Sequence, residues 1–165
     1  MPSSPPTNNQ DLLQNAKSRR NSWIESSPVC TKIIDLGFNL QYMSRAGYEA
    51  LQIADISTYY GKQYPLDFYP QSFHDEMTKT IKSARDTGKS MTQEASLQDL
   101  NGNDLWFHST ITPMYDQKNQ LEYFMIVSID ITERMSTEIK LNQMNTKLES
   151  VVASRMKELK KANKQ

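Results

Sequence analysis

The cysteine and histidines of this sequence, the side chains from which a zinc site is usually built, are few and lie far apart along the chain. Cys30, His74 and His108 are the only cysteine and histidines among the 165 residues. One thiol and two separated imidazoles do not make a zinc set, because a structural zinc site needs four ligands at short, regular spacings. The chain also lacks a glycine-rich phosphate loop, a metalloprotease histidine pair and a nucleophile motif. The sequence therefore predicts no metal site and no catalytic residue, and an enzyme of unrecognised type is kept as an alternative.

The formal net charge is zero, but the charges are divided unevenly between two regions. Residues 28–132 hold 8 basic and 13 acidic side chains, a balance of −5, and residues 133–165 hold 8 basic and 4 acidic, a balance of +4. A basic segment can bind nucleic acid or an acidic membrane surface. This one has no aromatic residue for base stacking and no compact basic block. We therefore expect a solvated helix face and no nucleic-acid partner.

The cysteine count and the lack of long apolar runs indicate the compartment. A single cysteine excludes a disulfide within the chain and is typical of a reducing environment. The longest purely apolar run is Phe124 to Val127, whereas a membrane-spanning helix needs about 20 such residues. The polar N-terminus has no signal-peptide core. We expect a soluble, cytoplasmic chain without a membrane span, although a longer parent protein could still be anchored.

The elements that would position any site begin after a polar N-terminal segment. Residues 1–10 are too polar to fold alone and are expected to form a disordered tail. Residues 11–24 carry Leu12, Ala16 and Trp23 on one face, which predicts an amphipathic helix. Such a helix can cover a sheet or pair with a copy of itself.

Five strands and a set of helices follow in an order typical of an α+β fold. The predicted strands are residues 29–36, 40–43, 91–100, 105–115 and 121–129. A turn at Gly37, Phe38 and Asn39 joins the first two strands, and a helix over residues 71–87, ended by Gly88, precedes the last three. The last strand is apolar on both faces, which predicts a central strand that is covered on both sides. The sequence therefore predicts a five-stranded antiparallel sheet with helices on one face.

Short polar residues and glycine mark the ends of these elements. Ser44 is expected to cap a short helix that runs to Leu51. Asn101 and Gly102 supply a tight turn between two strands, and Asn119 is the residue of the final turn that best tolerates a left-handed conformation.

The predicted long helix and the sheet could enclose a small-molecule pocket between them. Five side chains of the helix and the last three strands could line it: Met77, Ile81, Met91, Phe107 and Met125. Three of the five are methionines, which fill cores more often than they surround a ligand. Plain core packing is therefore the alternative explanation of the same residues.

Residues 132–165 contain no proline or glycine and carry one continuous apolar stripe. Its members recur at gaps of three and four residues: Leu141, Met144, Leu148, Val152, Met156 and Leu159. A helix of this length would be about 50 Å long at 1.5 Å per residue. An isolated helix with an exposed apolar face is marginally stable in water. We therefore expect the helix to pair with a second copy of itself as a coiled coil, giving a homodimer to which the N-terminal helix also contributes.

Several segments together resemble the PAS family of sensor domains. Residues 25–51, ESSPVCTKIIDLGFNLQYMSRAGYEAL, look like the opening hairpin and first helix of the family. Residues 59–70, YYGKQYPLDFYP, are similar to the segment before its long helix. Residues 100–134, LNGNDLWFHSTITPMYDQKNQLEYFMIVSIDITER, are close to its C-terminal signature. The resemblance implies a PAS domain over residues 25–131 and a signalling helix over residues 132–165.

The resemblance also assigns roles to the residues that follow the last strand. In PAS proteins the Asp-Ile-Thr segment couples this strand to an output helix, which here implicates Asp130, Thr132 and Arg134 in signal transmission. Asp130 or Thr132 can cap that helix, and Asp130 can pair with Arg134 one turn later. The segment LESVVASRMKELKKANKQ is similar to helices that lead to histidine kinases. The expected function is thus the sensor of a two-component system with its output domain beyond residue 165, and a diguanylate cyclase or a transcription regulator is the alternative.

The resemblance leaves the stimulus and any cofactor unknown. The flavin-binding branch of the family carries an Asn-Cys-Arg signature on a helix, which this sequence lacks. Some PAS domains bind haem through a histidine of the long helix. Here His74 lies near the start of that predicted helix, and Met77 stands closer to the expected position. We therefore expect neither flavin nor haem, and we keep a small-molecule ligand as an alternative to simple pairing.

Overall fold

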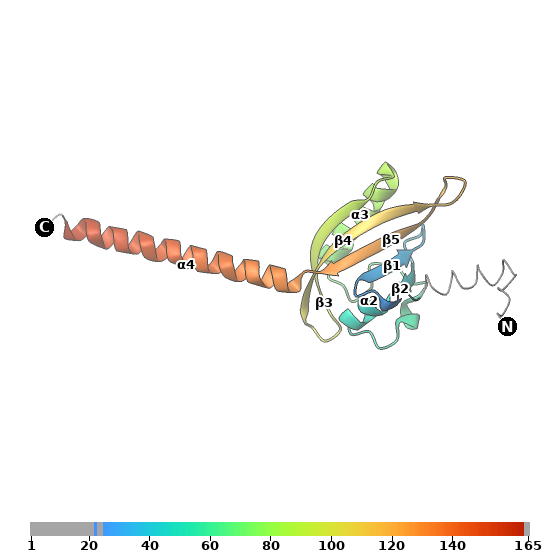
Figure 1. The fold of residues 1–165 in the computed structure, drawn as a ribbon, viewed down its shortest axis with the longest axis horizontal. Coiled ribbons are helices and arrows are strands. Elements are labelled where there is room, and N and C mark those ends of the chain that lie inside the picture. The colour runs from blue at the N-terminus through green and yellow to red at the C-terminus, as the bar shows by residue number, and fades with distance from the viewer. Residues whose placement is uncertain (1–21, 23–24, 164–165) are drawn as a thin grey trace, which may run out of the picture. The chain divides into compact units, whose positions relative to one another are not determined.

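The computed structural model describes Ser22 and residues 25–163. Five strands form one antiparallel sheet in the order β2-β1-β5-β4-β3 (Figure 1). The strands are β1 Cys30–Ile34, β2 Leu40–Met43, β3 Met91–Gln98, β4 Asp104–Tyr115 and β5 Leu121–Asp130. The predicted fold class, an antiparallel five-stranded α+β sheet with helices on one face and a long C-terminal helix, is confirmed. Apart from Ser22, the predicted tail over residues 1–10 and the predicted helix over residues 11–24 lie outside the described residues.

Strand β5 lies in the middle of the sheet, between β1 and β4, as its apolar sequence predicts. Phe124 and Ile126 point to the inner face and are fully buried. Met125 and Val127 alternate with them on the outer face and are half-buried. Ile129, on the same outer face near the end of β5, is 51% exposed, so cover on that face of the strand remains a prediction.

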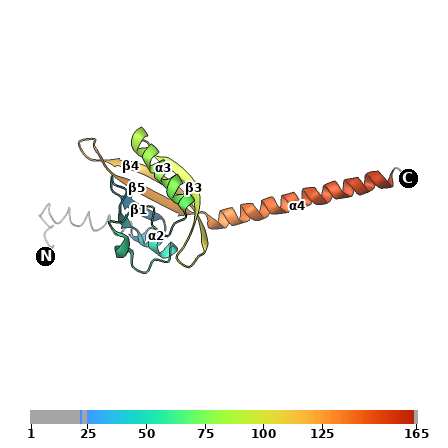
Figure 2. The ribbon, with the colours of Figure 1, turned by 180° about the vertical axis from the view of Figure 1, so that it is seen from behind.

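Helix α3, Gln71–Thr87, packs on β3 and β4 through the apolar stripe of its sequence (Figure 2). Phe73, Met77, Ile81 and Ala84 recur every three or four residues, and all four are buried. They join the inner residues of the sheet in a single hydrophobic core. The helix therefore covers the face of the sheet on which the candidate site lies.

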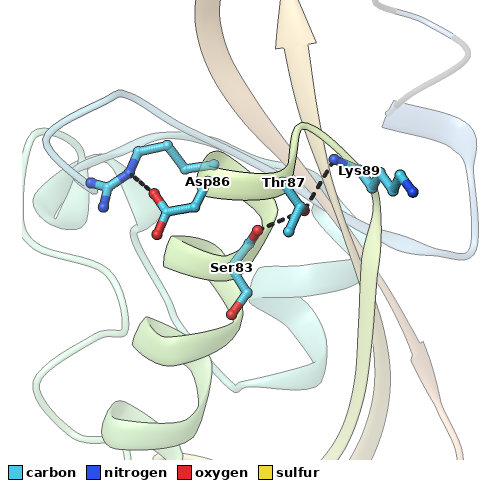
Figure 3. A network of polar contacts seen from close by, with 5 residues as sticks. Ser83, Asp86, Thr87 and Lys89 are labelled. Carbon is cyan, nitrogen blue, oxygen red and sulfur yellow. Dashed lines mark hydrogen bonds and ion pairs between the residues drawn. The ribbon is translucent and has the colours of Figure 1, made fainter.

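The C-terminus of α3 is closed by a left-handed glycine and a small polar network. Gly88 has a φ of 67°, as its position predicts, and its N–H donates to the Ala84 carbonyl. Thr87 Oγ1 donates to the Ser83 carbonyl at 2.7 Å and accepts from the Lys89 N–H at 3.3 Å (Figure 3). The Gly88 bond satisfies the Ala84 carbonyl, one of the four that the end of α3 would otherwise leave without a helical partner, and Thr87 Oγ1 ties the helix end to the Lys89 N–H.

Two short helices, α2 at Arg45–Ala50 and η1 at Ile56–Tyr59, connect β2 to α3. Ser44 occupies the N-cap position of α2, as predicted, but its side chain does not bond the helix. Its Oγ instead accepts from the Thr31 N–H at 2.9 Å and donates to the Val29 carbonyl at 3.2 Å. The hydroxyl therefore ties the start of α2 to β1.

Helix α4, Thr132–Ala162, belongs to a second unit of the chain that begins at Ile131. Ile131 is the only residue between β5 and α4, and this junction contains neither glycine nor proline. Ile131 also occupies the N-cap position, where it makes no side-chain bond to the helix. The long C-terminal helix is confirmed, and capping of its first turn by the Asp130 or Thr132 side chain remains a prediction.

Candidate ligand-binding site

A row of polar side chains crosses the otherwise apolar inner face of the sheet. Cys30, Ser128, Ser109 and Gln93 are successive register partners on β1, β5, β4 and β3. Register partners of antiparallel strands project to the same face, and neighbouring strands lie about 4.8 Å apart. The inner residue that precedes Ser128 along β5 is Ile126, which is fully buried. The polar row therefore lies in the interior of the domain.

Lys32 adds a positive charge to this polar row. It lies on the inner side of β1, two residues after Cys30, and is only 5% exposed. Its Nζ donates to Ser128 Oγ at 3.1 Å, and the Oγ atoms of Ser128 and Ser109 are 2.9 Å apart. Nζ also lies 5.9 Å from the centre of the Tyr64 ring, a cation–π contact. Among the described residues, no carboxylate forms an ion pair with Lys32.

Burial and neighbouring groups act in opposite directions on the charge of Lys32. Loss of water around Nζ lowers the pKa of the ammonium, whereas the Cys30 thiolate and the Tyr64 phenolate raise it, and the balance leaves the pKa above its ordinary value. Burial raises the pKa of the Tyr64 phenol and raises that of Tyr69 well above its ordinary value. At neutral pH both phenols are therefore uncharged, so neither Tyr64 nor Tyr69 supplies a counter-charge to Lys32.

A small closed cavity lies against Lys32 and the two serines. It is lined by the sheet, by α3 and by the segment between β2 and α3: Cys30, Lys32, Leu51, Tyr64, Tyr69, Phe73, Leu97, Phe107, Ser109 and Ser128. The open space at its centre is about 10 Å³, room for about one water molecule. A larger ligand can therefore enter only when lining side chains move apart.

Gln93 lies at the β3 end of the polar row. Both polar atoms of its side-chain amide are buried, and neither makes a hydrogen bond within the described part of the chain. Leaving a buried amide without partners costs about 1–3 kcal/mol, so such groups are rare in folded proteins. Because Gln93 is the register partner of Ser109, its amide projects to the same face as the serine hydroxyls.

Four of the five predicted pocket residues belong to this interior. Met77, Ile81 and Phe107 are buried in the hydrophobic core, and Met91 packs against it. Phe107 also lines the cavity. Met125 lies on the opposite face of β5, so this residue is not part of the inner surface. A role of the other four in ligand binding remains a prediction.

The polar members of the site, Lys32, Gln93, Ser109 and Ser128, were not among the residues expected from the sequence. Lys32 occupies an inward position of the predicted first strand, where alternation calls for an apolar side chain. A polar residue at such a position is a signal that could have revealed it. The other three become recognisable only when the pairing of β3, β4 and β5 is known.

The predicted signal-transmission residues follow one another at the junction of β5 and α4. Asp130 ends β5, and Thr132 and Arg134 lie in the first turn of α4. The stripe of α4 contains Leu141, Met144, Leu148, Val152, Met156 and Leu159, and each of these residues is 52–63% exposed. No residue of α4 is buried. The pairing of Asp130 with Arg134 and the dimer seam remain predictions.

The residues first considered for metal chemistry are not gathered together. Within residues 25–163 and Ser22, no group of three or more His, Cys, Asp or Glu side chains is placed to hold a metal ion. His74 is half-buried near the start of α3, His108 Nδ1 lies 3.2 Å from Glu94 Oε1, and Cys30 is buried. None of the helices in the described residues combines the length and apolarity that crossing a membrane requires.

Comparison with known families supports the sensor resemblance. A family model described as the PAS fold matches residues 24–136, which is more than half of the chain. The chain therefore belongs to the PAS family and contains a PAS sensory domain. No curated protein matches the sequence.

Several solved structures share this fold at low sequence identity. An RNA-binding light-oxygen-voltage receptor matches with a TM-score of 0.67 at 18% identity, and the match covers 88% of this chain and 41% of that receptor. The PAS domain of a protein from Colwellia psychrerythraea matches with a TM-score of 0.63 at 15% identity, over 72% of this chain and 98% of that one. The VqmA–ligand–DNA complex from Vibrio cholera matches with a TM-score of 0.61 at 16% identity, over 69% and 50%. These similarities show the shared fold alone.

Proposed function

We propose that this chain is a dimeric PAS sensor module whose α4 helix carries a signal to a histidine kinase. The observation that carries the proposal is the exposed apolar stripe of α4. A 31-residue helix without any buried residue has little to hold it in water unless its apolar face is covered. The gaps of three and four residues in the stripe suit the seam of a coiled coil, so a second copy of the helix is the partner that fits.

The junction between β5 and α4 is suited to transmit a conformational change. Ser128 lines the cavity, and it lies two residues before Asp130, the last residue of β5. Ile131 alone then leads into α4, without a glycine or proline that could absorb changes in φ and ψ. A displacement of β5 at the cavity therefore has only a short length of regular backbone to cross before it reaches the helix.

The cavity supplies the sensing end of this proposal. Its polar row and its aromatic lining provide both orientation and apolar contact for a small molecule. The similar VqmA structure is described as a complex with a ligand, which supports a ligand for this domain too. The kinase output is supported by the likeness of residues 148–165 to helices that lead to such enzymes.

Helical phasing tests the proposed output. The experiment joins Asn163 to the catalytic part of a histidine kinase through inserts of one to seven alanines. Each added residue turns the kinase by about 100° about the helix axis. We expect autophosphorylation to rise and fall with the helical period of the insert, because a rigid paired helix sets the orientation of the two kinase units. Activity that does not depend on insert length would contradict signalling through α4.

A regulator that binds nucleic acid is the second candidate function. It is favoured by the described DNA complex of VqmA, by the RNA-binding receptor, and by exposed Lys157, Lys160 and Lys161 near the end of α4. This function predicts binding to duplex DNA or RNA that weakens steeply as salt is added. Lys160→Ala combined with Lys161→Ala should weaken the binding and reduce its salt dependence. A flat titration of the unmodified chain at low salt would eliminate this function.

A further inference from the structure

We propose that the interior site of Lys32, Ser109, Ser128 and Gln93 binds a small organic acid, with the carboxylate held by Lys32 Nζ and the serine hydroxyls. This inference rests on the sensor function proposed above and names the chemical class of its ligand. The ligand class follows from the charge at Lys32, from the hydrogen-bonding capacity around it, and from the aromatic side chains that close the cavity.

The charge of Lys32 is the first step. Its Nζ is enclosed; it donates to the Ser128 hydroxyl at 3.1 Å and also bonds the Cys30 side chain, and no carboxylate among the described residues pairs with it. The ring of Tyr64 lies further away, at 5.9 Å. A buried ammonium is normally paired with a carboxylate, since neutral hydroxyls replace only part of the water it has lost. The interior therefore favours an entering anion over a neutral molecule of the same shape.

The orientation of the hydroxyl groups is the second step. Ser128 Oγ accepts from Lys32, and either serine can donate across the 2.9 Å between Ser128 Oγ and Ser109 Oγ; we take the arrangement in which Ser128 donates. The Ser109 proton is then available to a further acceptor in the cavity. Lys32, which has three N–H groups, can donate to that acceptor as well. An ammonium and a hydroxyl that converge in this way match the two oxygens of a carboxylate.

Gln93 provides a second polar anchor on the same face. Its amide has a donor and an acceptor, both buried and both without a hydrogen bond in this structure. It stands one strand further along the row than Ser109, just beyond the residues that line the cavity, so a ligand reaches it only when the lining opens in that direction. A second polar group on the ligand, such as a hydroxyl, or a water carried in with it, would satisfy this amide. The unsatisfied amide is therefore explained if the domain is built for an occupied state.

The apolar part of the lining selects the body of the ligand. Tyr69 and Phe73 are in edge contact, with ring centres 4.9 Å apart, and Phe107 and Leu97 close the cavity from the sheet. Flat aromatic bodies pack well among such rings. The open space is only about 10 Å³, so an aromatic acid must push α3 and the sheet side chains apart. Binding and conformational change are then one event, as a sensor requires.

The test uses the full chain and two probes of equal shape, sodium benzoate and benzamide. Thermal unfolding and isothermal titration calorimetry are measured with each probe at matched ionic strength. We expect benzoate to raise the melting temperature saturably and benzamide to bind about tenfold more weakly or not at all, because benzamide lacks the charge. No response to benzoate, or equal responses to the two probes, would overturn the proposal.

Variants separate the site from adventitious binding. Lys32→Met keeps the length of the side chain and should weaken benzoate binding about tenfold or more, whereas exposed Lys118→Met is the control and should change nothing. Should Lys32→Met fail to fold, Gln93→Leu is the second variant. It removes the unsatisfied amide and should raise the melting temperature of the empty protein. Benzoate affinity retained in Lys32→Met, or a Gln93→Leu protein less stable than the parent, would overturn the proposal.

The oligomeric state distinguishes the failure of this inference from the failure of the proposed function. If the chain shows no response to benzoate but is a dimer, the acid site is refuted and the proposed sensor module is retained. If the chain binds benzoate through Lys32 but is a monomer, the acid site is retained and the proposed dimeric signalling helix is refuted.

Discussion

Replacing Leu148 and Val152 together by glutamate should separate the two copies of α4. The two residues are one helical turn apart in the middle of the apolar stripe, and they are 58% and 52% exposed in the single chain. Pairing would remove them from water, whereas two glutamates in the same place would bring like charges into the seam. We expect the double variant to be monomeric at concentrations where the parent chain is a dimer.

The size of the effect follows from these exposures. Complete burial of a leucine or valine side chain stabilises the folded or associated state by about 1.5–3 kcal/mol relative to full exposure of that side chain. About half of each residue is still exposed in α4, so pairing should contribute about 1 kcal/mol for each side chain covered. A dimer contains both residues twice, so the double variant loses about 4 kcal/mol. That loss corresponds to a roughly 1000-fold increase in the dissociation constant, before any charge repulsion is added.

Sedimentation equilibrium measures this dissociation constant directly. Thr146→Glu combined with Ser150→Glu is the matched control, because it adds the same charges at the same spacing on the opposite face of the helix at 100° per residue. The control should dimerise as the parent does. An unchanged dissociation constant in the Leu148 and Val152 variant, or equal loss in the control, would refute the assignment of the stripe as the seam.

Two further predictions concern the stability of the PAS domain. A Cβ at Gly47 would lie 2.6 Å from Cys30 Sγ and 2.8 Å from Met43 Cγ. Gly47→Ala should therefore lower the free energy of unfolding, measured in urea, by about 1–3 kcal/mol, and adding Cys30→Ala should recover part of the loss. An unchanged stability in Gly47→Ala, or no recovery in the double variant, would contradict this packing. Hydrogen bonds from the Asn103 side chain and backbone N–H lower the pKa of the Asp99 carboxyl in the folded protein. The ionised carboxylate therefore stabilises the fold fully above its unfolded-state pKa of about 3.9, and this stabilisation is lost as the pH falls through the lower folded-state pKa. Asp99→Asn should therefore lower the melting temperature at neutral pH and flatten its decline in acid, as followed by circular dichroism, and a profile equal to that of the parent would count against it.

Local patterns were sufficient to predict most elements of the fold. The spacing of apolar residues in α3 and the left-handed residues Gly88 and Asn119, with φ of 67° and 60°, are properties of short stretches of sequence. The first hairpin turn differs, because Phe38 and not Gly37 adopts the positive φ, 65°. The Phe38 ring is buried edge-on against Phe124, 5.9 Å between ring centres, so packing in the core overrides the local preference of glycine.

The candidate site was less accessible to prediction because pairing between distant strands creates it. Lys32 and Ser128 are 96 residues apart in sequence, and Ser109 and Ser128 are 19 apart. Their contact depends on the order of strands and on register, which no local pattern determines. The dependence on register also explains why Met125 was predicted to line the pocket although it lies on the opposite face of β5, because a displacement of one residue along a strand moves a side chain to the other face.

Pairing of α4 in solution is the central claim, and the distance between two spin labels tests it most directly. A nitroxide attached at Ser150→Cys in the full chain lies on the face of α4 away from the stripe, and the parent chain treated in the same way accounts for buried Cys30. Helices of a coiled coil pack about 8–10 Å apart, so two labels on their outer faces should show a narrow distance distribution on the order of 20–30 Å by double electron–electron resonance. Absence of dipolar coupling between the labels at concentrations where the sensor is assayed would contradict the account.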